Sequence, residues 1–161
     1  MTAVLPAHLR LGPVGLRVAS VPRSIAWYER VLGLVPRMVH EGTVALTTTE
    51  GEELIRLREV PGASPVPERG RRGLYHHAVR LPSRAALAAF LRHLESLREP
   101  FSASDHLFSE ALYLQDPDGI TLEVYADRPR ETWHWEGDEV LGAIDRKSTR
   151  LNSSHTVISY A

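Results

Sequence analysis

The sequence has no cysteine, and it has one lysine and one asparagine among 161 residues. The absence of thiols excludes disulfides and thiolate ligands, so a bound metal would be held by nitrogen and oxygen. No apolar run approaches the ~20 residues that cross a bilayer, and the start lacks the apolar stretch of a secretory signal, which predicts a cytoplasmic protein without membrane contact. A net charge of −1 gives no general reason to bind nucleic acid.

The single lysine and the single asparagine, Lys147 and Asn152, both fall within residues 145–161. This segment, DRKSTRLNSSHTVISYA, lacks apolar periodicity and is similar to the translation of a short-read sequencing adapter. We therefore predict a non-native, disordered tail that follows a gene cut near Ile144, so that the chain is the front portion of a longer protein. The alternative is a natural polar chain end, a place where disorder is common.

The sequence contains two similar segments, residues 11–34 and 73–97. Each combines an alternating apolar run with an amphipathic stretch, which predicts a strand followed by a helix. Ser20 and Ser83 occupy N-cap positions, and Gly33 suits the end of the first helix. Strand candidates follow each helix, at 35–41, 43–48 and 53–59 in the first copy and at 101–105, 109–115 and 119–126 in the second.

This repeat predicts an α+β domain over residues 1–144, built from two βαβββ modules. The predicted parts are module one at 10–60, a linker rich in proline, glycine and arginine at 61–73, module two at 74–127, and an extension at 128–144. The tail at 145–161 completes the division.

Alternation along the predicted strands separates a face packed against the helices from the opposite face of the sheet, which we call the cup face. In the segment 74–81, His77 falls on the apolar side, so His76 is predicted to point into the cup. The same alternation places Glu123 and Tyr113 on the cup face. An imidazole, a carboxylate and a phenol are therefore expected to converge.

Two of these residues belong to a longer motif in the second copy. Its order is His106, Tyr113, a D-P-D-G turn at 116–119, and Glu123. Imidazole and carboxylate are ligands for a non-haem metal, and a further histidine and a phenol suit proton transfer and hydrogen bonding. The order resembles the fingerprint of extradiol ring-cleaving dioxygenases, in which a histidine and a tyrosine precede D-P-x-G and an iron-binding glutamate. The double βαβββ pattern resembles the vicinal oxygen chelate superfamily, which includes these enzymes, glyoxalase I and bleomycin-resistance proteins.

The resemblance implies a glyoxalase-like fold in which two modules form a cupped mixed sheet around a metal. It also implies an Fe(II) site, with Mn(II) as an alternative, in which His76 and Glu123 are ligands. His106 would act as general acid and base, and Tyr113 would hydrogen-bond a substrate oxygen. The predicted function is metal-dependent extradiol cleavage of a catechol-type aromatic substrate by dioxygen, as in the degradation of aromatic compounds.

Each assignment has a simpler alternative. His76 could be a packed structural histidine, Glu123 could form a salt bridge with an arginine, His106 could be a loop residue, and Tyr113 could be a wall residue. For the whole chain, the alternatives are a non-catalytic small-molecule binding domain of the bleomycin-resistance type and a degenerate structural half.

The predicted metal site is one ligand short. An Fe(II) facial triad uses two histidines and one carboxylate, but aligning the two copies places Pro13 opposite His76 and Arg56 opposite Glu123. The third ligand could come from a missing C-terminal half, and a homo-oligomer is another possible partner; His8 precedes the first strand and is poorly placed. Alternatively, this domain is a degenerate copy.

Three arginines, Arg17, Arg56 and Arg80, also fall on the predicted cup face. Guanidinium groups bind carboxylates and phosphates. The substrate is therefore expected to be able to carry an anionic substituent.

Overall fold

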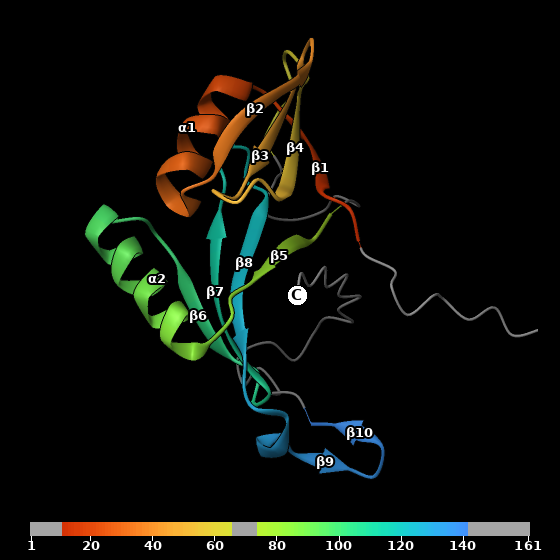
Figure 1. Cartoon of the computed structure of the whole chain (residues 1–161), viewed down its shortest axis with the longest axis vertical. Coiled ribbons are helices and arrows are strands. Elements are labelled where there is room, and N and C mark those ends of the chain that lie inside the picture. The colour runs from red at the N-terminus through yellow and green to blue at the C-terminus, as the bar shows by residue number, and fades with distance from the viewer. Residues whose placement is uncertain (1–10, 66–73, 142–161) are drawn as a thin grey trace, which may run out of the picture.

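The structure, a computed structural model, describes residues 11–65 and 74–141 (Figure 1). The predicted tail at 145–161, most of the predicted linker and His8 lie outside the described residues.

The predicted βαβββ order occurs in both halves of the chain. The first module consists of β1 (Val14–Val18), α1 (Val21–Leu32), β2 (Val35–His40), β3 (Thr43–Thr47) and β4 (Glu53–Glu59). The second consists of β5 (His76–Arg80), α2 (Arg84–Leu97), β6 (Ser102–Asp105), β7 (Ser109–Gln115) and β8 (Thr121–Asp127). The α+β class is confirmed, and the predicted strand limits differ from the observed ones by at most two residues.

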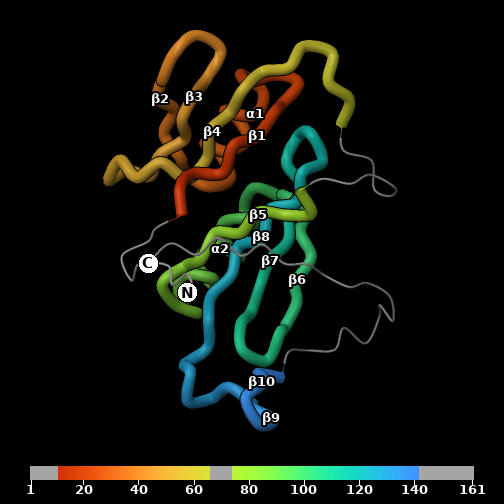
Figure 2. Tube along the Cα trace, turned by 90° about the vertical axis from the view of Figure 1, so that its right-hand side faces the viewer, coloured from red at the N-terminus to blue at the C-terminus, as the bar shows by residue number. Residues whose placement is uncertain are grey.

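The two modules form separate four-stranded sheets of the same topology. Their strand orders are β1-β4-β3-β2 and β5-β8-β7-β6, and the first pair in each is parallel while the others are antiparallel. The modules stack along the long axis, with α1 and α2 on the same side of the molecule (Figures 1 and 2). A buried apolar cluster joins residues of both modules beneath these helices.

Serine caps begin both helices, as the sequence predicts. The Ser20 hydroxyl accepts a hydrogen bond from the Arg23 amide, and the Ser83 hydroxyl accepts one from the Ala86 amide. Gly33 ends α1 with a left-handed φ of 68°. Neither α1 nor α2, the α-helices of the described residues, has the length and apolar character needed to span a bilayer.

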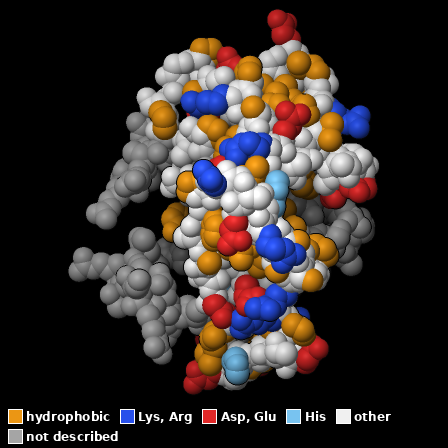
Figure 3. All heavy atoms as spheres, turned by 90° about the vertical axis from the view of Figure 1, so that its left-hand side faces the viewer, with side chains coloured by type: hydrophobic (Ala, Val, Ile, Leu, Met, Phe, Trp, Pro, Cys, Tyr) orange, Lys and Arg blue, Asp and Glu red, His pale blue; other side chains and the backbone are white. Residues whose placement is uncertain are grey.

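The outer face on the helix side mixes charges of both signs with apolar side chains (Figure 3). Its described part shows no continuous patch of one sign. This distribution agrees with the small net charge of the chain.

The D-P-D-G turn joins the modules as well as two strands. Asp118 Oδ1 accepts hydrogen bonds from the Ala19 amide at 3.1 Å and from Arg23 Nη2 at 2.7 Å. The Tyr28 hydroxyl donates to Asp116 Oδ2 at 3.1 Å. The start of α1 in the first module therefore docks onto the turn that leads into β8 of the second.

The predicted extension is folded over residues 128–141. It contains a short 3-10 helix, η1 (Arg130–Thr132), and a small hairpin of β9 (Trp135–Glu136) and β10 (Glu139–Val140). The Arg130 guanidinium lies over the Trp133 and Trp135 rings, and Trp133 packs 5.7 Å from Phe108 between ring centroids. The extension therefore packs, through its aromatic rings, against the β6–β7 turn at the lower end of the second module (Figure 1).

Candidate active site

Four predicted site residues lie in one chain of polar contacts. His76 Nε2 is 2.9 Å from Glu123 Oε2, and the Tyr113 hydroxyl donates to Glu123 Oε1 at 3.0 Å. His106 Nε2 is 2.9 Å from the Tyr113 hydroxyl. Because the single phenol hydrogen points to the carboxylate, we infer that His106 donates from Nε2 to the phenol oxygen.

Strand register explains how three of these side chains meet. Tyr113 on β7 pairs directly with Glu123 on β8, and Ala78 on β5 pairs with Glu123 from the other side. His76 lies two residues before Ala78 and projects to the same face, because side chains alternate along a strand. His77 points the other way, and its ring lies 6.4 Å from that of Tyr28 on α1. The predicted facing of His76 and His77 is therefore observed.

Burial and hydrogen bonding set the charge of the Glu123–Tyr113 pair. Burial alone would raise the pKa of Glu123, but hydrogen bonds from His76 and Tyr113 outweigh it and hold that pKa below its usual range. Burial, followed by the nearby Glu123 charge, raises the pKa of Tyr113 well above its usual value. At neutral pH the pair is therefore a carboxylate and a protonated phenol.

The simpler alternative for Glu123, a salt bridge with an arginine, is not the arrangement around Arg56. Arg56 contacts Glu53 at 2.7 Å on its own strand, β4. The partner of Glu123 is instead His76. The His76 side chain is 2% exposed and the Glu123 side chain is 11% exposed. A carboxylate this buried needs a partner, because its desolvation is otherwise costly.

A pocket of about 410 Å³ opens beside this chain of contacts. Its walls are largely aromatic and combine β7, β8, the β6–β7 turn and the folded extension, through His106, Phe108, Ser109, Tyr113, Glu123, Tyr125, Asp127, Trp133 and Val140. Trp133 and Val140 were not identified from the sequence, where the aromatic pair Trp133 and Trp135 was the available signal. This pocket can enclose an aromatic ring and shield it from water.

The expectation that arginines line the substrate site is wrong for this pocket. None of its lining residues is an arginine, and two are acidic, Glu123 and Asp127. Arg80 lies 3.3 Å from Asp127, and Arg17 is exposed on β1. The lining of this pocket therefore presents carboxylates and no guanidinium group.

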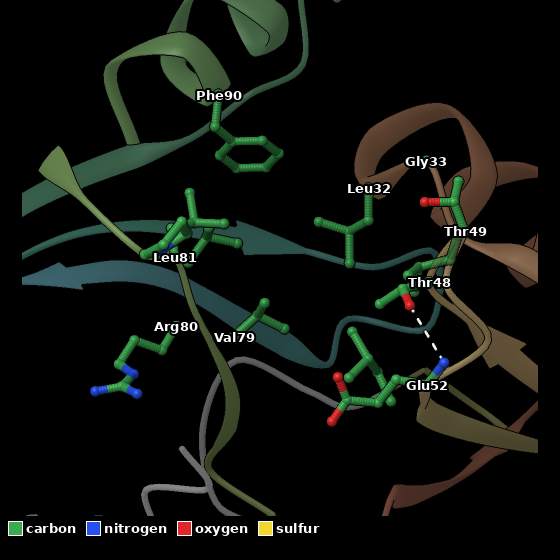
Figure 4. Close-up of a pocket in the computed structure, with 13 residues that line it drawn as sticks. Leu32, Gly33, Thr48, Thr49, Glu52, Val79, Arg80, Leu81 and Phe90 are labelled. Carbon is green, nitrogen blue, oxygen red and sulfur yellow. Dashed lines mark hydrogen bonds between the residues drawn. The ribbon is translucent and has the colours of Figure 1, made fainter. Parts of the chain in front are cut away.

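A different pocket, of about 550 Å³, lies between the modules on the opposite face of β5 (Figure 4). Leu32, Val79 and Phe90 point into its interior, while Arg80 and Glu52 lie at its margin. It contains no histidine and is separated from His76 by the strand itself. It therefore has no part in the arrangement described above.

The two predicted metal ligands, His76 and Glu123, lie in contact with each other. Within residues 11–65 and 74–141, no three histidine, aspartate or glutamate side chains are placed to hold one ion. Comparison of the two modules explains why a further carboxylate ligand is lacking. Arg56 pairs with Gly15 in the first sheet at the position where Glu123 pairs with Ala78 in the second, so the first module has an arginine in place of a glutamate. An imidazole and an ionised carboxylate directed at one point are chemically suited to Fe(II) or Mn(II), as two members of a larger ligand set.

Residues 10–124 match the family described as the Glyoxalase/Bleomycin resistance protein/Dioxygenase superfamily. The chain belongs to this superfamily. Among solved structures, a glyoxylase/bleomycin resistance protein/dioxygenase domain from Frankia sp. EAN1pec is similar with a TM-score of 0.64 and 23% identity, over 76% of this chain and 100% of that one. The glyoxalase-like fold implied by the repeat is confirmed.

Two proteins that are named as dioxygenases are similar in sequence to this superfamily member. A catechol-2,3-dioxygenase from Bacillus subtilis (strain 168) is 41% identical over 133 residues, which cover 81% of this chain and 47% of that protein. A biphenyl-2,3-diol 1,2-dioxygenase 3 from Rhodococcus globerulus is 31% identical over 137 residues, which cover 81% of this chain and 72% of that protein. The chain thus spans about half the length of the first relative.

Proposed function

We propose that this chain carries part of the site of an extradiol dioxygenase that acts on an uncharged catechol-type substrate. In such a reaction the ring bond beside the two hydroxyls breaks, and both atoms of dioxygen enter the product. The observation that carries the proposal is the contact chain from His76 through Glu123 and Tyr113 to His106, at the edge of an aromatic pocket. The identity to a catechol-2,3-dioxygenase supports it.

His76 and Glu123 would hold Fe(II), with Mn(II) as the alternative. The imidazole Nε2 and the carboxylate oxygen face each other at 2.9 Å, and the lowered pKa of Glu123 keeps the carboxylate ionised for binding. When bound, the metal would supply Lewis-acid binding of the substrate hydroxyls and electron transfer to dioxygen.

The other residues of the site would bind the substrate and transfer protons. His106 would accept a proton from a substrate hydroxyl at an unprotonated ring nitrogen and later return it, acting first as general base and then as general acid. Tyr113 would donate its hydroxyl hydrogen to a substrate oxygen, since its raised pKa keeps it protonated. Phe108, Tyr125 and Trp133 would stack around the ring and exclude water.

The remaining ligand would come from outside the described residues. A longer protein is the source we favour, because the chain covers only 47% of its catechol-2,3-dioxygenase relative. The second candidate function is a binding domain without catalysis, or a degenerate structural half. The observation that favours it is the shortage of a three-residue ligand set in the described part of the chain.

Metal content and oxygen uptake test the proposal. The chain as it stands should bind well under one Fe(II) per molecule, because two protein ligands give a weaker chelate than three, and elemental analysis measures this. Extension to the full natural protein should give iron-dependent oxygen uptake with catechol and a yellow ring-fission product. Glu123→Ala and His76→Ala should abolish that uptake, whereas Asp127→Asn, which alters another carboxylate of the same pocket, should keep most of it.

Two results would count against the site. Full activity in both His76→Ala and Glu123→Ala would mean that this domain is a degenerate copy and that the working site lies elsewhere. One tightly bound iron per molecule of the present chain would mean that a ligand has been missed.

A further inference from the structure

The turn that carries His106 has an unusual backbone conformation. Leu107 has a φ of 65°, in the left-handed region that favours glycine. The Phe108 amide donates to the His106 carbonyl at 2.8 Å and so closes a three-residue turn around Leu107. A turn closed in this way with a positive φ at its centre is the rare and strained form of the γ-turn. Strain of this kind persists only where the surroundings enforce it.

Arg128 supplies much of that enforcement. Its Nη1 donates to the Leu107 carbonyl at 3.1 Å, and its Nη2 donates to Asp105 at 2.8 Å and to Glu110 at 3.0 Å. Its own amide donates to the Phe108 carbonyl at 2.8 Å. One guanidinium therefore binds the carbonyl of the strained residue and the carboxylates on either side of the turn. Its planar group of donors suits this task.

The neighbouring arginine contacts the same network without touching the turn. Arg84 contacts Glu110 at 2.6 Å from α2, and its side chain is 77% exposed. The Arg128 side chain is 30% exposed. Arg84 therefore shares the charge environment of Arg128 but has no contact with the backbone around Leu107, which makes it a matched control.

The conformation of this turn decides where His106 points. In the strained form, His106 Nε2 lies 2.9 Å from the Tyr113 hydroxyl, and the two rings meet edge to face with centroids 6.2 Å apart. A change of φ at Leu107 to an ordinary negative value would rotate the preceding peptide. The imidazole would then move away from Tyr113 and from the pocket.

We propose that Arg128 is a positioning residue for His106, which holds the Leu107 turn in its strained conformation so that the imidazole faces Tyr113. The catalytic consequence rests on the proposed function. The positioning itself does not, because it can be measured without metal or substrate.

The direct test is the contact between the His106 and Tyr113 rings, read by nuclear Overhauser effects on the full chain. Arg128→Met should lose most of this signal, and Arg84→Met should retain it. The signal between His77 and Tyr28, on the other face of β5, should persist in both variants and report that the fold is intact. An unchanged His106–Tyr113 signal in folded Arg128→Met would overturn the proposal.

A rescue experiment separates positioning from a general stabilising role. Glycine adopts a positive φ without steric cost, so Leu107→Gly should restore the His106–Tyr113 signal in the Arg128→Met background. A role limited to surface charge predicts no rescue, and that result would refute the mechanism. If Arg128→Met does not fold, Arg128→Lys is used instead, since one ammonium cannot reproduce the forked contacts.

Kinetics adds a readout that depends on the proposed function. In the iron-loaded full protein, Arg128→Met should lower kcat by about 10- to 100-fold, the range expected for a misplaced proton-transfer group, with little change in KM. Equal kcat values would contradict the catalytic consequence. An inactive parent protein would contradict the proposed function alone, because the ring contacts still decide whether Arg128 positions His106.

Discussion

Replacing His77 by leucine tests how much the fold loses when it is acidified. His77 is 2% exposed and lies on the helix-facing side of β5, beside Tyr28. Burial, and then the charge of the adjacent His76, lowers the pKa of His77 from 6.5 to about 4. In the unfolded chain the same imidazole is solvated and regains its ordinary proton affinity.

The sign follows from which state binds the proton. Between pH 6.5 and pH 4, His77 is protonated in the unfolded chain but stays neutral in the folded chain. The stability linked to this group is therefore fully present above pH 6.5 and is lost as the pH falls towards 4. A lowering from 6.5 to about 4 is worth about 3 kcal/mol of unfolding free energy in total, and about 2 kcal/mol of that is lost by pH 5.

Urea unfolding at a series of pH values between 7 and 5 measures this effect. The parent chain should lose about 2 kcal/mol more over that range than His77→Leu, whose side chain cannot titrate. His40→Leu, which changes an exposed histidine on β2, should follow the parent profile. Parallel profiles for the parent and His77→Leu would show that His77 is not kept neutral by the fold.

Three further outcomes are expected. Asp118→Ala should lower the unfolding free energy by about 2–3 kcal/mol in urea titrations, because it leaves the Ala19 amide and Arg23 without their acceptor, and a loss within error would contradict the docking role of the turn. Trp133→Ala should weaken binding of a phenyl-substituted catechol by about 1–2 kcal/mol in calorimetry, with a smaller effect on catechol itself, since one aromatic wall is removed. Deletion of residues 145–161 should leave the melting temperature unchanged, and a fall of several degrees would count against a non-native tail.

The parts of the site that follow from local periodicity could be predicted from the sequence. His76, Glu123 and Tyr113 share a face because side chains alternate along any strand, and the apolar neighbours identify the other face. The serine caps are equally local, since a hydroxyl at that position satisfies an amide of the first helical turn. In each case the signal lies within a few residues of the feature it predicts.

The parts that depend on long-range packing gave no such signal. Asp118 meets Arg23 across 95 positions of sequence, and its motif by itself indicates only a turn. Trp133 reaches the pocket because the extension folds back, which no periodicity predicts. The placement of His106 beside Tyr113 depends on the left-handed conformation of Leu107. Leucine rarely adopts this conformation, so the sequence does not predict it.

The docking of α1 onto the D-P-D-G turn has a consequence for how the molecule unfolds. The carboxylates of Asp116 and Asp118 bind the first module. The D-P-D-G turn to which they belong leads into β8, the strand that bears Glu123. The buried apolar cluster also draws side chains from both modules. The two modules are therefore distinct in the sequence, but neither is stable independently of the other. The two halves should melt in a single cooperative transition, and unfolding of the first module should disorder the Glu123 carboxylate in the second.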